Sequence, residues 1–319
     1  MLAIVNFHYI RHSFAAPYAS IYGITPSYFE RQLLTYAKYS VFIGGRELSD
    51  LMQKGEPVRG NRLLITFDDG LKEQYELAYP ILIKHGVPAV FFINTRSLME
   101  KTVADVHKIH LVRSLCPSEE ILGEVHNILD GRLSKAEWPV IKSSATMHYK
   151  YDDLNSAELK YLLNFTLSLA EREILINQLF ARYFPDEEYV STSLYMDAEH
   201  IRELGNLGYV GSHGHDHIPM GMLSNDQKDF HVRQSKEILE FTTGTEVSAF
   251  SYPYGSKESC RNMDEVLGKN NYTFAVTMTR GLNIVFDKPF HLNRYDNNDL
   301  PLGKTYRYTD NNFFKMLKD

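Results

Sequence analysis

The sequence predicts a parallel α/β fold arranged as a (β/α) barrel, complete or incomplete, with a helical insertion. Three observations indicate this fold. Apolar, strand-like runs alternate with helix-like segments near both ends of the chain, which is typical of parallel α/β proteins. The central stretch keeps a helical periodicity but loses the strand pattern. Polar side chains follow several predicted strands, as they do at the catalytic rim of α/β barrels. The even spacing of these elements favours a barrel over an open sheet.

The first alternating region covers about the first 95 residues. Its predicted strands are short apolar runs: Leu2–Phe7, Arg62–Phe67 and Ala89–Asn94. A helix is predicted over residues 26–38, because Thr25 is a favourable N-cap and Pro26 suits the first helical position. Another helix is expected after the turn at Asp69-Gly70.

The chain is expected to be one barrel domain over residues 1–319, interrupted by a helical insertion over residues 96–189. Within the insertion we predict three helices from the spacing of apolar residues: Val103–Leu115, Ser118–Leu129 and Glu158–Phe184. The insertion is interpreted as a lid over the rim or as a surface for forming an oligomer.

From Ser191 the alternation of strands and helices resumes. The predicted strands of this region are Tyr209–Ser212, Val247–Ser251, Thr273–Thr277 and Phe290–Arg294. The predicted helices are Asp197–Leu207, Asn225–Phe241, Lys257–Leu267 and Asp310–Leu317. Both regions together supply the repeated strand and helix units that a barrel needs.

Composition excludes several classes of partner. The net charge of −6 gives no basic surface for nucleic acid, and no Lys/Arg cluster indicates a lipid surface. Two cysteines, far apart, favour a reducing compartment over a secreted disulfide scaffold. The first residues lack a basic n-region and are interpreted as a buried strand, not a signal peptide. Apolar runs such as Val87–Ile93 are too short to span a bilayer. A cytoplasmic protein without a transmembrane segment is therefore expected.

Two adjacent carboxylates, Asp68 and Asp69, close the apolar run of the second predicted strand. Neighbouring side chains on an extended segment point to opposite sides, so one can bind a metal while the other faces a bound water. A nearby cation would keep both carboxylates ionised. The alternative is that Asp-Asp-Gly is only a turn and a helix cap.

A second cluster follows the strand that ends at Ser212. His213, His215 and His217 occupy alternate positions, and His213 and His217 are four residues apart. That spacing would bring the two rings together on one helical turn, as in known zinc sites. Two imidazoles and one carboxylate, with positions left for water, are typical of a catalytic zinc site. His215 would point elsewhere, and Asp216 could orient a ligand imidazole.

The motifs resemble those of the polysaccharide deacetylase family (carbohydrate esterase family 4, the NodB homology domain). The resemblance rests on three motifs in the family's order and separation: Thr66-Phe67-Asp68-Asp69-Gly70, Ser212-His213 with His217, and Ser251-Tyr252-Pro253-Tyr254-Gly255. It extends over most of the chain outside the insertion. Phe7-His8-Tyr9 is similar to the first strand of the poly-N-acetylglucosamine deacetylase branch. The family fold is a distorted (β/α) barrel.

The resemblance implies that Asp69, His213 and His217 bind one divalent metal ion and that Asp68 is the general base. Mixed imidazole and carboxylate ligation suits Zn²⁺ first, with Co²⁺, Ni²⁺ or Fe²⁺ as alternatives. The expected substrate is an amino sugar, as a small molecule or an oligosaccharide.

The sequence departs from the family pattern at several positions. Where the family has an arginine that tethers the base, this chain has Ser251, and Arg294 is either a substitute or part of a surface salt bridge. Gly214 stands where the family has Ser or Thr. His291 precedes Leu292 instead of following it, so the general acid is either His291 or His8.

The expected reaction is metal-dependent hydrolysis of the N-acyl group of an amino sugar. Because Pro253 has no N–H, the backbone N–H of Tyr254 is the candidate oxyanion donor. Tyr252 and Tyr254 are candidates for stacking on a sugar ring. With a cytoplasmic location, the substrate would be a nucleotide-linked, lipid-linked or oligosaccharide precursor of a surface polysaccharide. The alternatives are a catalytically impaired, metal-containing carbohydrate-binding protein and a metal amidohydrolase acting on a non-sugar amide.

Overall fold

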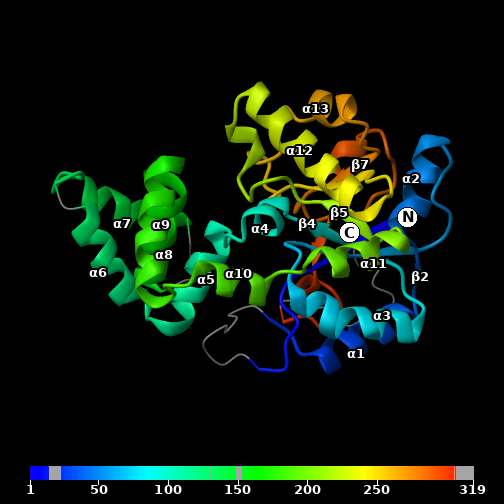
Figure 1. Ribbon diagram of the computed structural model, residues 1–319, viewed down its shortest axis with the longest axis horizontal. Coiled ribbons are helices and arrows are strands. Elements are labelled where there is room, and N and C mark those ends of the chain that lie inside the picture. The colour runs from blue at the N-terminus through cyan, green and yellow to red at the C-terminus, as the bar shows by residue number, and fades with distance from the viewer. Residues whose placement is uncertain (14–22, 130, 149–152, 305, 307–319) are drawn as a thin grey trace. The chain divides into compact units, whose positions relative to one another are not determined.

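The computed structural model describes residues 1–13, 23–129, 131–148, 153–304 and 306. These residues form two compact units. One is built from residues 1–12, 23–102 and the part of the chain from 191 onward, and the other includes residues 103–190. The first unit carries the sheet, and the second is helical (Figure 1).

The sheet of the first unit is parallel at every paired strand. Its order is β7-β6-β5-β4-β3-β1-β8, with β2 also paired to β3. The strands are β1 Leu2–Phe7, β2 Val41–Phe42, β3 Arg62–Phe67, β4 Ala89–Ile93, β5 Val210–Ser212, β6 Ala249–Ser251, β7 Phe274–Val276 and β8 Tyr295–Asp296. The sheet curls into a half-barrel surrounded by helices (Figure 1). The predicted distorted (β/α) barrel is therefore confirmed, in its incomplete form.

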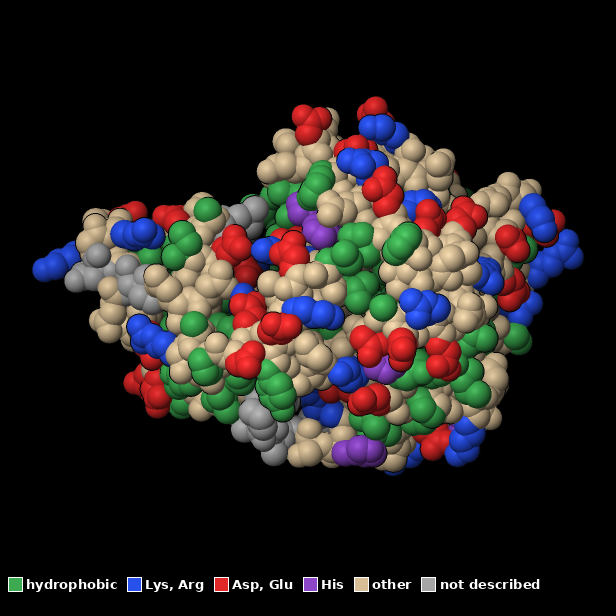
Figure 2. Space-filling view, viewed as in Figure 1, with side chains coloured by type: hydrophobic (Ala, Val, Ile, Leu, Met, Phe, Trp, Pro, Cys, Tyr) green, Lys and Arg blue, Asp and Glu red, His purple; other side chains and the backbone are tan. Residues whose placement is uncertain are grey.

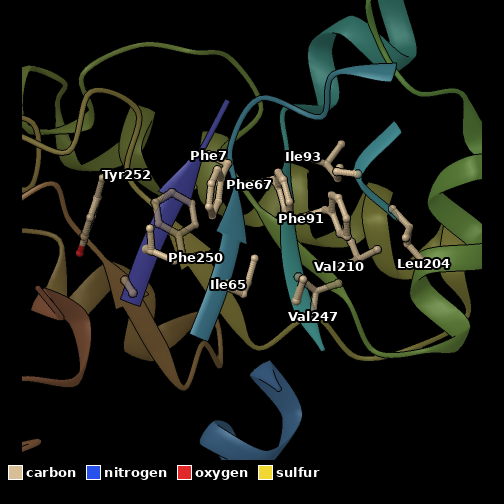
Figure 3. Close-up of a cluster of buried hydrophobic side chains, with 14 of the residues drawn as sticks. Phe7, Ile65, Phe67, Phe91, Ile93, Leu204, Val210, Val247, Phe250 and Tyr252 are labelled. Atoms are coloured by element: carbon tan, nitrogen blue, oxygen red, sulfur yellow. The ribbon is translucent and has the colours of Figure 1, made fainter. Parts of the chain in front are cut away.

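Both faces of the central strands are buried. Along β3, Ile65 and Phe67 face one apolar cluster while Leu64 faces another, as the alternation of side chains along a strand requires. Figure 3 shows the first cluster, in which the rings of Phe67 and Phe91 stack with their centroids 4.6 Å apart. Continuous apolar runs are typical of parallel strands that are covered on both sides. This packing holds the carboxyl ends of the strands at fixed positions.

The helices of the first unit begin at recognisable caps. Thr25 accepts a hydrogen bond from the Tyr28 N–H, with Pro26 at the first helical position, as predicted. Ser224 and Gln227 form a capping box at the start of α12. The helices are α1 Pro26–Tyr36, α2 Gly45–Gln53, α3 Tyr79–His85, α4 Thr95–Glu100, α11 Ala198–Asn206, α12 Asn225–Thr243 and α13 Asp264–Lys269, with a π-helical turn at Gln74–Ala78 before α3.

The second unit is helical, as predicted. Its helices are α5 Asp105–Leu115, α6 Ser118–Leu129, α7 Glu137–His148, α8 Leu154–Tyr161 and α9 Leu169–Tyr183, and α10 Glu187–Leu194 leads back to the first unit. The single helix predicted over residues 158–184 is wrong. Leu167 is extended, and Ser168 starts a new helix through a capping box with Glu171. This pair of capping hydrogen bonds satisfies helix-start N–H groups and favours a break at that point.

Two predictions in the last third of the chain are also wrong. Residues 290–294 do not form a strand. Pro289–His291 is a 3₁₀ turn, and β8 begins at Tyr295. Residues 257–262 form turns, and α13 starts only at Asp264, after Asn262 with φ of 55°. The helix predicted at Asp310–Leu317 lies outside the described residues.

Acidic and basic side chains are interspersed over the face shown in Figure 2. Among the residues that the structure describes, no helix combines the length and the apolar character needed to cross a membrane.

Candidate metal centre

Side chains from five chain segments meet at the carboxyl ends of the strands. Asp68 and Asp69 follow β3, His213 and His217 follow β5, and Tyr254 follows β6. Asn6 and His8 lie at the end of β1, and Arg294 directly precedes β8. The ends of β1, β3, β5 and β6 give the convergence that the predicted rim implied. Arg294 was expected at the end of a strand and lies instead directly before the start of β8.

Asp69, His213 and His217 bring one ligand atom each to a common point. The three atoms lie within 4.8 Å of one another, and all three residues are buried. Asp69 Oδ1 is 3.4 Å from Nε2 of His213 and 3.4 Å from Nε2 of His217. Both distances exceed a normal N–H···O hydrogen bond of about 2.7–3.2 Å. Two ring nitrogens therefore converge on one carboxylate oxygen at a spacing that a metal ion can bridge.

The tautomer of His213 fits metal binding. Its Nδ1 lies 2.8 Å from the carbonyl oxygen of Ser251. A carbonyl can only accept, so Nδ1 carries the proton and Nε2 presents its lone pair to the centre. Burial would lower the pKa of His213, but Asp68 and Asp69 raise it above its ordinary value. The same negative potential favours a cation, so the residues present fit a divalent ion.

Local backbone conformation separates the two aspartates. Asp69 has φ of 80° and Gly70 has φ of 68°, so the chain turns sharply where β3 ends. Asp69 is left-handed and not extended, which differs from the strand geometry expected from the sequence. Asp tolerates this conformation better than most residues. Asp69 thereby faces the two imidazoles, and Asp68 faces β1 and Arg294.

Asp68 is held by a buried guanidinium. Arg294 donates from Nη1 to Oδ1 at 2.8 Å and from Nη2 to Oδ2 at 2.7 Å, and Asn6 donates to Oδ2 at 3.0 Å. Burial raises the pKa of Asp68, but Arg294, His213 and His8 together more than offset it, and the pKa lies below its ordinary value. Arg294 is 1% exposed. The pair is therefore not a surface salt bridge.

The two candidates for the general acid lie in different surroundings. His8 lies beside Asn6, with its ring nitrogens 3.4 and 3.5 Å from the amide nitrogen that also binds Asp68. His291 contacts Asp264 of α13 at 2.6 Å and stacks near Tyr252. Of the two histidines, the geometry connects only His8 to Asp68.

The two tyrosines of the third motif differ in exposure. Tyr252 is fully buried and its hydroxyl donates to the Phe290 carbonyl, so the prediction that it stacks on a sugar is wrong. Tyr254 is 36% exposed, has φ of 63°, and lies with its ring 4.9 Å from that of His217. Tyr254 thus presents an aromatic surface beside the candidate metal ligands.

The loop that carries the histidines is not helical. Residues 213 and 214 have no regular structure and residues 215–218 form bends, with Gly214 at φ of 77°. This left-handed conformation favours glycine over Ser or Thr at position 214, whereas an added Cβ would meet only the flexible end of the Met220 side chain. His215 points away from the centre, to Thr95. The predicted role of Asp216 is wrong, because Asp216 pairs with Arg96.

Sequence reasoning missed Asn6 and the carbonyl of Ser251. The only sequence signal for Asn6 is an amide in an otherwise apolar strand, next to His8. Asn6 pairs in register with Thr66, two residues before Asp68, so both side chains lie on the same face of the sheet.

We predict a large stability loss when Arg294 is replaced by Met. The change leaves the buried Asp68 carboxylate without its cation, and breaking a buried pair costs about 3–5 kcal/mol. Urea unfolding measures this loss. Arg280→Met is the matched control, because Arg280 pairs with Asp299 at an exposed position and should cost less than about 1 kcal/mol. Equal losses in the two variants would contradict the inferred role of the buried pair.

Comparison with known proteins shows which protein family this chain belongs to. A family model described as polysaccharide deacetylase matches residues 55–118 and 176–275, just over half of the chain. The protein belongs to the polysaccharide deacetylase family. The aspartate, histidine and third motifs lie inside the matched segments, whereas Asn6, His8, His291 and Arg294 lie outside them.

Similar solved structures share the fold at low sequence identity. They include the Streptococcus pyogenes deacetylase PplD in complex with acetate (TM-score 0.56, 15% identity, covering 92% of this chain and 91% of that one). IcaB from Ammonifex degensii has a TM-score of 0.52 and 17% sequence identity, and the match covers 92% of this chain and 90% of that one. A de-N-acetylase from Aggregatibacter actinomycetemcomitans has a TM-score of 0.53 and 12% sequence identity, and the match covers 96% of this chain and 97% of that one. A search of curated proteins found no match.

Proposed function

We propose that the protein removes the N-acetyl group from an amino sugar in a polysaccharide or oligosaccharide, using one divalent metal ion held by Asp69, His213 and His217. The observation that carries the proposal is the convergence of these three buried ligand atoms next to a second, separately held carboxylate. A bound ion would supply a Lewis acid for the acyl carbonyl and lower the pKa of a bound water.

Asp68 is the proposed general base. An ionised carboxylate can accept about four hydrogen bonds, and Arg294 and Asn6 take one on Oδ1 and two on Oδ2. Oδ1 therefore keeps a direction in which it can accept the proton of the attacking water. The lowered pKa keeps Asp68 ionised, so it is ready to act as a base near neutral pH.

His8 is the proposed general acid, and the backbone N–H of Tyr254 is the proposed oxyanion donor. His8 lies on the β1 side of Asp68, from which it can protonate the departing amine. Tyr254 is next to the ligand His217, and its exposed ring offers a stacking surface for a sugar. The contacts of His291 with Asp264 and Tyr252 favour a structural role for it.

The arginine at position 294 weakens the case for a catalytically impaired binding protein. That alternative arose because Ser251 replaces the family arginine. Arg294 reaches the same carboxylate from another segment, so the base keeps a guanidinium partner.

The direct test is a turnover assay. Metal-loaded protein is incubated with N-acetylglucosamine oligomers, with polymer and with nucleotide-linked N-acetylglucosamine, and both released acetate and new free amine are measured. We expect equal amounts of the two products from at least one sugar. Binding without acetate release would instead indicate a binding protein, and turnover of non-sugar amides alone would indicate a different amidohydrolase.

A further inference from the structure

The loop that carries two of the proposed ligands is supported by the residues at the start of α4, directly after β4. We call residues 213–217 the ligand loop and residues 94–96 the brace. The backbone N–H groups of Thr95 and Arg96 donate to the carbonyls of Gly214 and His215 at 3.3 and 2.7 Å. Two consecutive backbone contacts therefore set the brace in register with the ligand loop.

The side chain of Asn94 adds two hydrogen bonds to the ligand loop, one at His215 and one at His217. A carbonyl only accepts and an N–H only donates, which fixes how its amide is oriented. In that orientation the amide nitrogen donates to the His215 carbonyl at 3.2 Å, and the amide oxygen accepts from the His217 N–H at 3.0 Å. Asn94 thus binds the backbone of a ligand residue directly.

Asn94 makes these hydrogen bonds instead of capping α4 with its side chain. It is the N-cap residue of α4, yet its side chain makes no capping hydrogen bond. Asn at this position normally accepts from the second or third helical N–H, and the bond contributes about 1 kcal/mol. The side chain instead spans the ligand loop and is 4% exposed as a residue.

Arg96 and Thr95 extend the brace through their side chains. Arg96 donates to the carboxylate of Asp216 at 2.7 Å, and the Thr95 hydroxyl lies 3.0 Å from Nδ1 of His215. Each residue of the brace therefore contacts the ligand loop, and the two non-ligand side chains at 215 and 216 are held away from the metal centre.

The ligand loop needs this support because it is not a helix. In a helix, the backbone hydrogen bonds would fix the offset between residues four apart, but Gly214 is left-handed here. The ring of His213 is fixed by the Ser251 carbonyl, and the backbone position of His217 is set by Asn94. The distance between the two imidazoles therefore depends on the brace.

We propose that Asn94 is a positioning residue for metal binding, which acts by fixing His217 relative to His213. The proposal rests on the metal centre proposed above. Contacts that orient metal ligands typically change metal affinity by about 10- to 100-fold when they are removed. Asn94→Leu keeps the approximate side-chain size and removes both hydrogen bonds, so it should weaken Zn²⁺ binding by about this factor.

The test measures Zn²⁺ affinity by competition with a chromophoric chelator and records the visible spectrum of the Co²⁺-loaded protein. Asn94→Leu should weaken affinity and alter the Co²⁺ bands, because the ligand geometry changes. Asn283→Leu is the matched control. Asn283 is equally buried, and its amide also binds backbone groups, those of Asn293 and Leu2. It should destabilise the fold without altering Zn²⁺ affinity or the Co²⁺ bands.

A second pair of variants keeps the proposal testable if Asn94→Leu does not fold. Arg96 is partly exposed, so Arg96→Met should fold and should also weaken Zn²⁺ binding, whereas Arg233→Met on α12 should not. Zn²⁺ affinity within twofold of the unmodified protein in whichever brace variants fold would overturn the proposal.

His213→Ala distinguishes a failure of the Asn94 proposal from a failure of the proposed metal centre. If His213→Ala abolishes metal binding while the brace variants bind normally, only the role of Asn94 fails. If the unmodified protein binds no metal, the proposed function fails as well.

Discussion

His213→Ala is expected to remove the bound metal and the deacetylase activity together. The imidazole provides one of the three candidate ligand atoms, and alanine offers no atom in its place. Two remaining ligands hold a divalent ion poorly, because tight catalytic sites use three protein ligands. Metal content after dialysis and acetate release measure the two losses on the same sample.

The control for His213→Ala is His107→Ala. His107 is also buried, at 2% exposure, but lies on α5 in the helical unit. Its removal costs packing without touching the metal ligands, so metal content and activity should persist. If His213→Ala retained stoichiometric metal, the proposed ligand set would be incorrect.

Asp68→Asn is expected to lower kcat by about 10²–10⁴, the usual contribution of a positioned general base, while metal content stays unchanged. An amide has nearly the same shape as the carboxylate but cannot take up the proton of the attacking water. Asp68 is not among the three ligands, so the ion should remain bound. Steady-state kinetics with parallel metal analysis distinguish this variant from His213→Ala.

Asp264→Asn is the informative comparison for Asp68→Asn. Asp264 is an exposed carboxylate that contacts His291, so its replacement tests whether the alternative acid matters. We expect kcat within about twofold of the unmodified enzyme, as for surface changes away from a site. A kcat for Asp68→Asn close to that of Asp264→Asn would show that Asp68 is not the base.

Much of the fold could be predicted because each strand of the barrel can be recognised from its own run of apolar residues. β1 and β3 match their predicted bounds, since uninterrupted apolar runs leave few other places for a buried parallel strand. The strand predicted over Phe290–Arg294 was wrong because this apolar run begins within the 3₁₀ turn at Pro289–His291. The break at Ser168 was missed because the helical periodicity continues across it, while the capping box decides the backbone.

The candidate site could be predicted only where side chains act directly. Asp69, His213 and His217 were assembled from strand ends and from motif resemblance, and the structure brings their ligand atoms together. The partners that hold them were not foreseen. The Ser251 carbonyl and the N–H groups of Thr95 and Arg96 act through backbone atoms, and Asn94 binds backbone groups of the ligand loop. The positions of these backbone atoms depend on strand register and loop conformation and not on residue type. Asn6 meets Asp68 only because of the β1–β3 register.

The cytoplasmic location, the choice between precursor and polymer as substrate, and the role of the helical insertion as a lid or an oligomer surface stay predictions. Zinc as the ion, rather than cobalt, nickel or iron, is also a prediction.

The most direct test is a crystal structure of the metal-loaded protein with anomalous data collected at the metal absorption edge. The account predicts one peak bound by Asp69 and by Nε2 of both His213 and His217, at about 2.0–2.2 Å if the ion is zinc. Asp68 should lie outside this coordination sphere and remain paired with Arg294. A peak bound by other residues, or metal-loaded protein with no peak between these three, would contradict it.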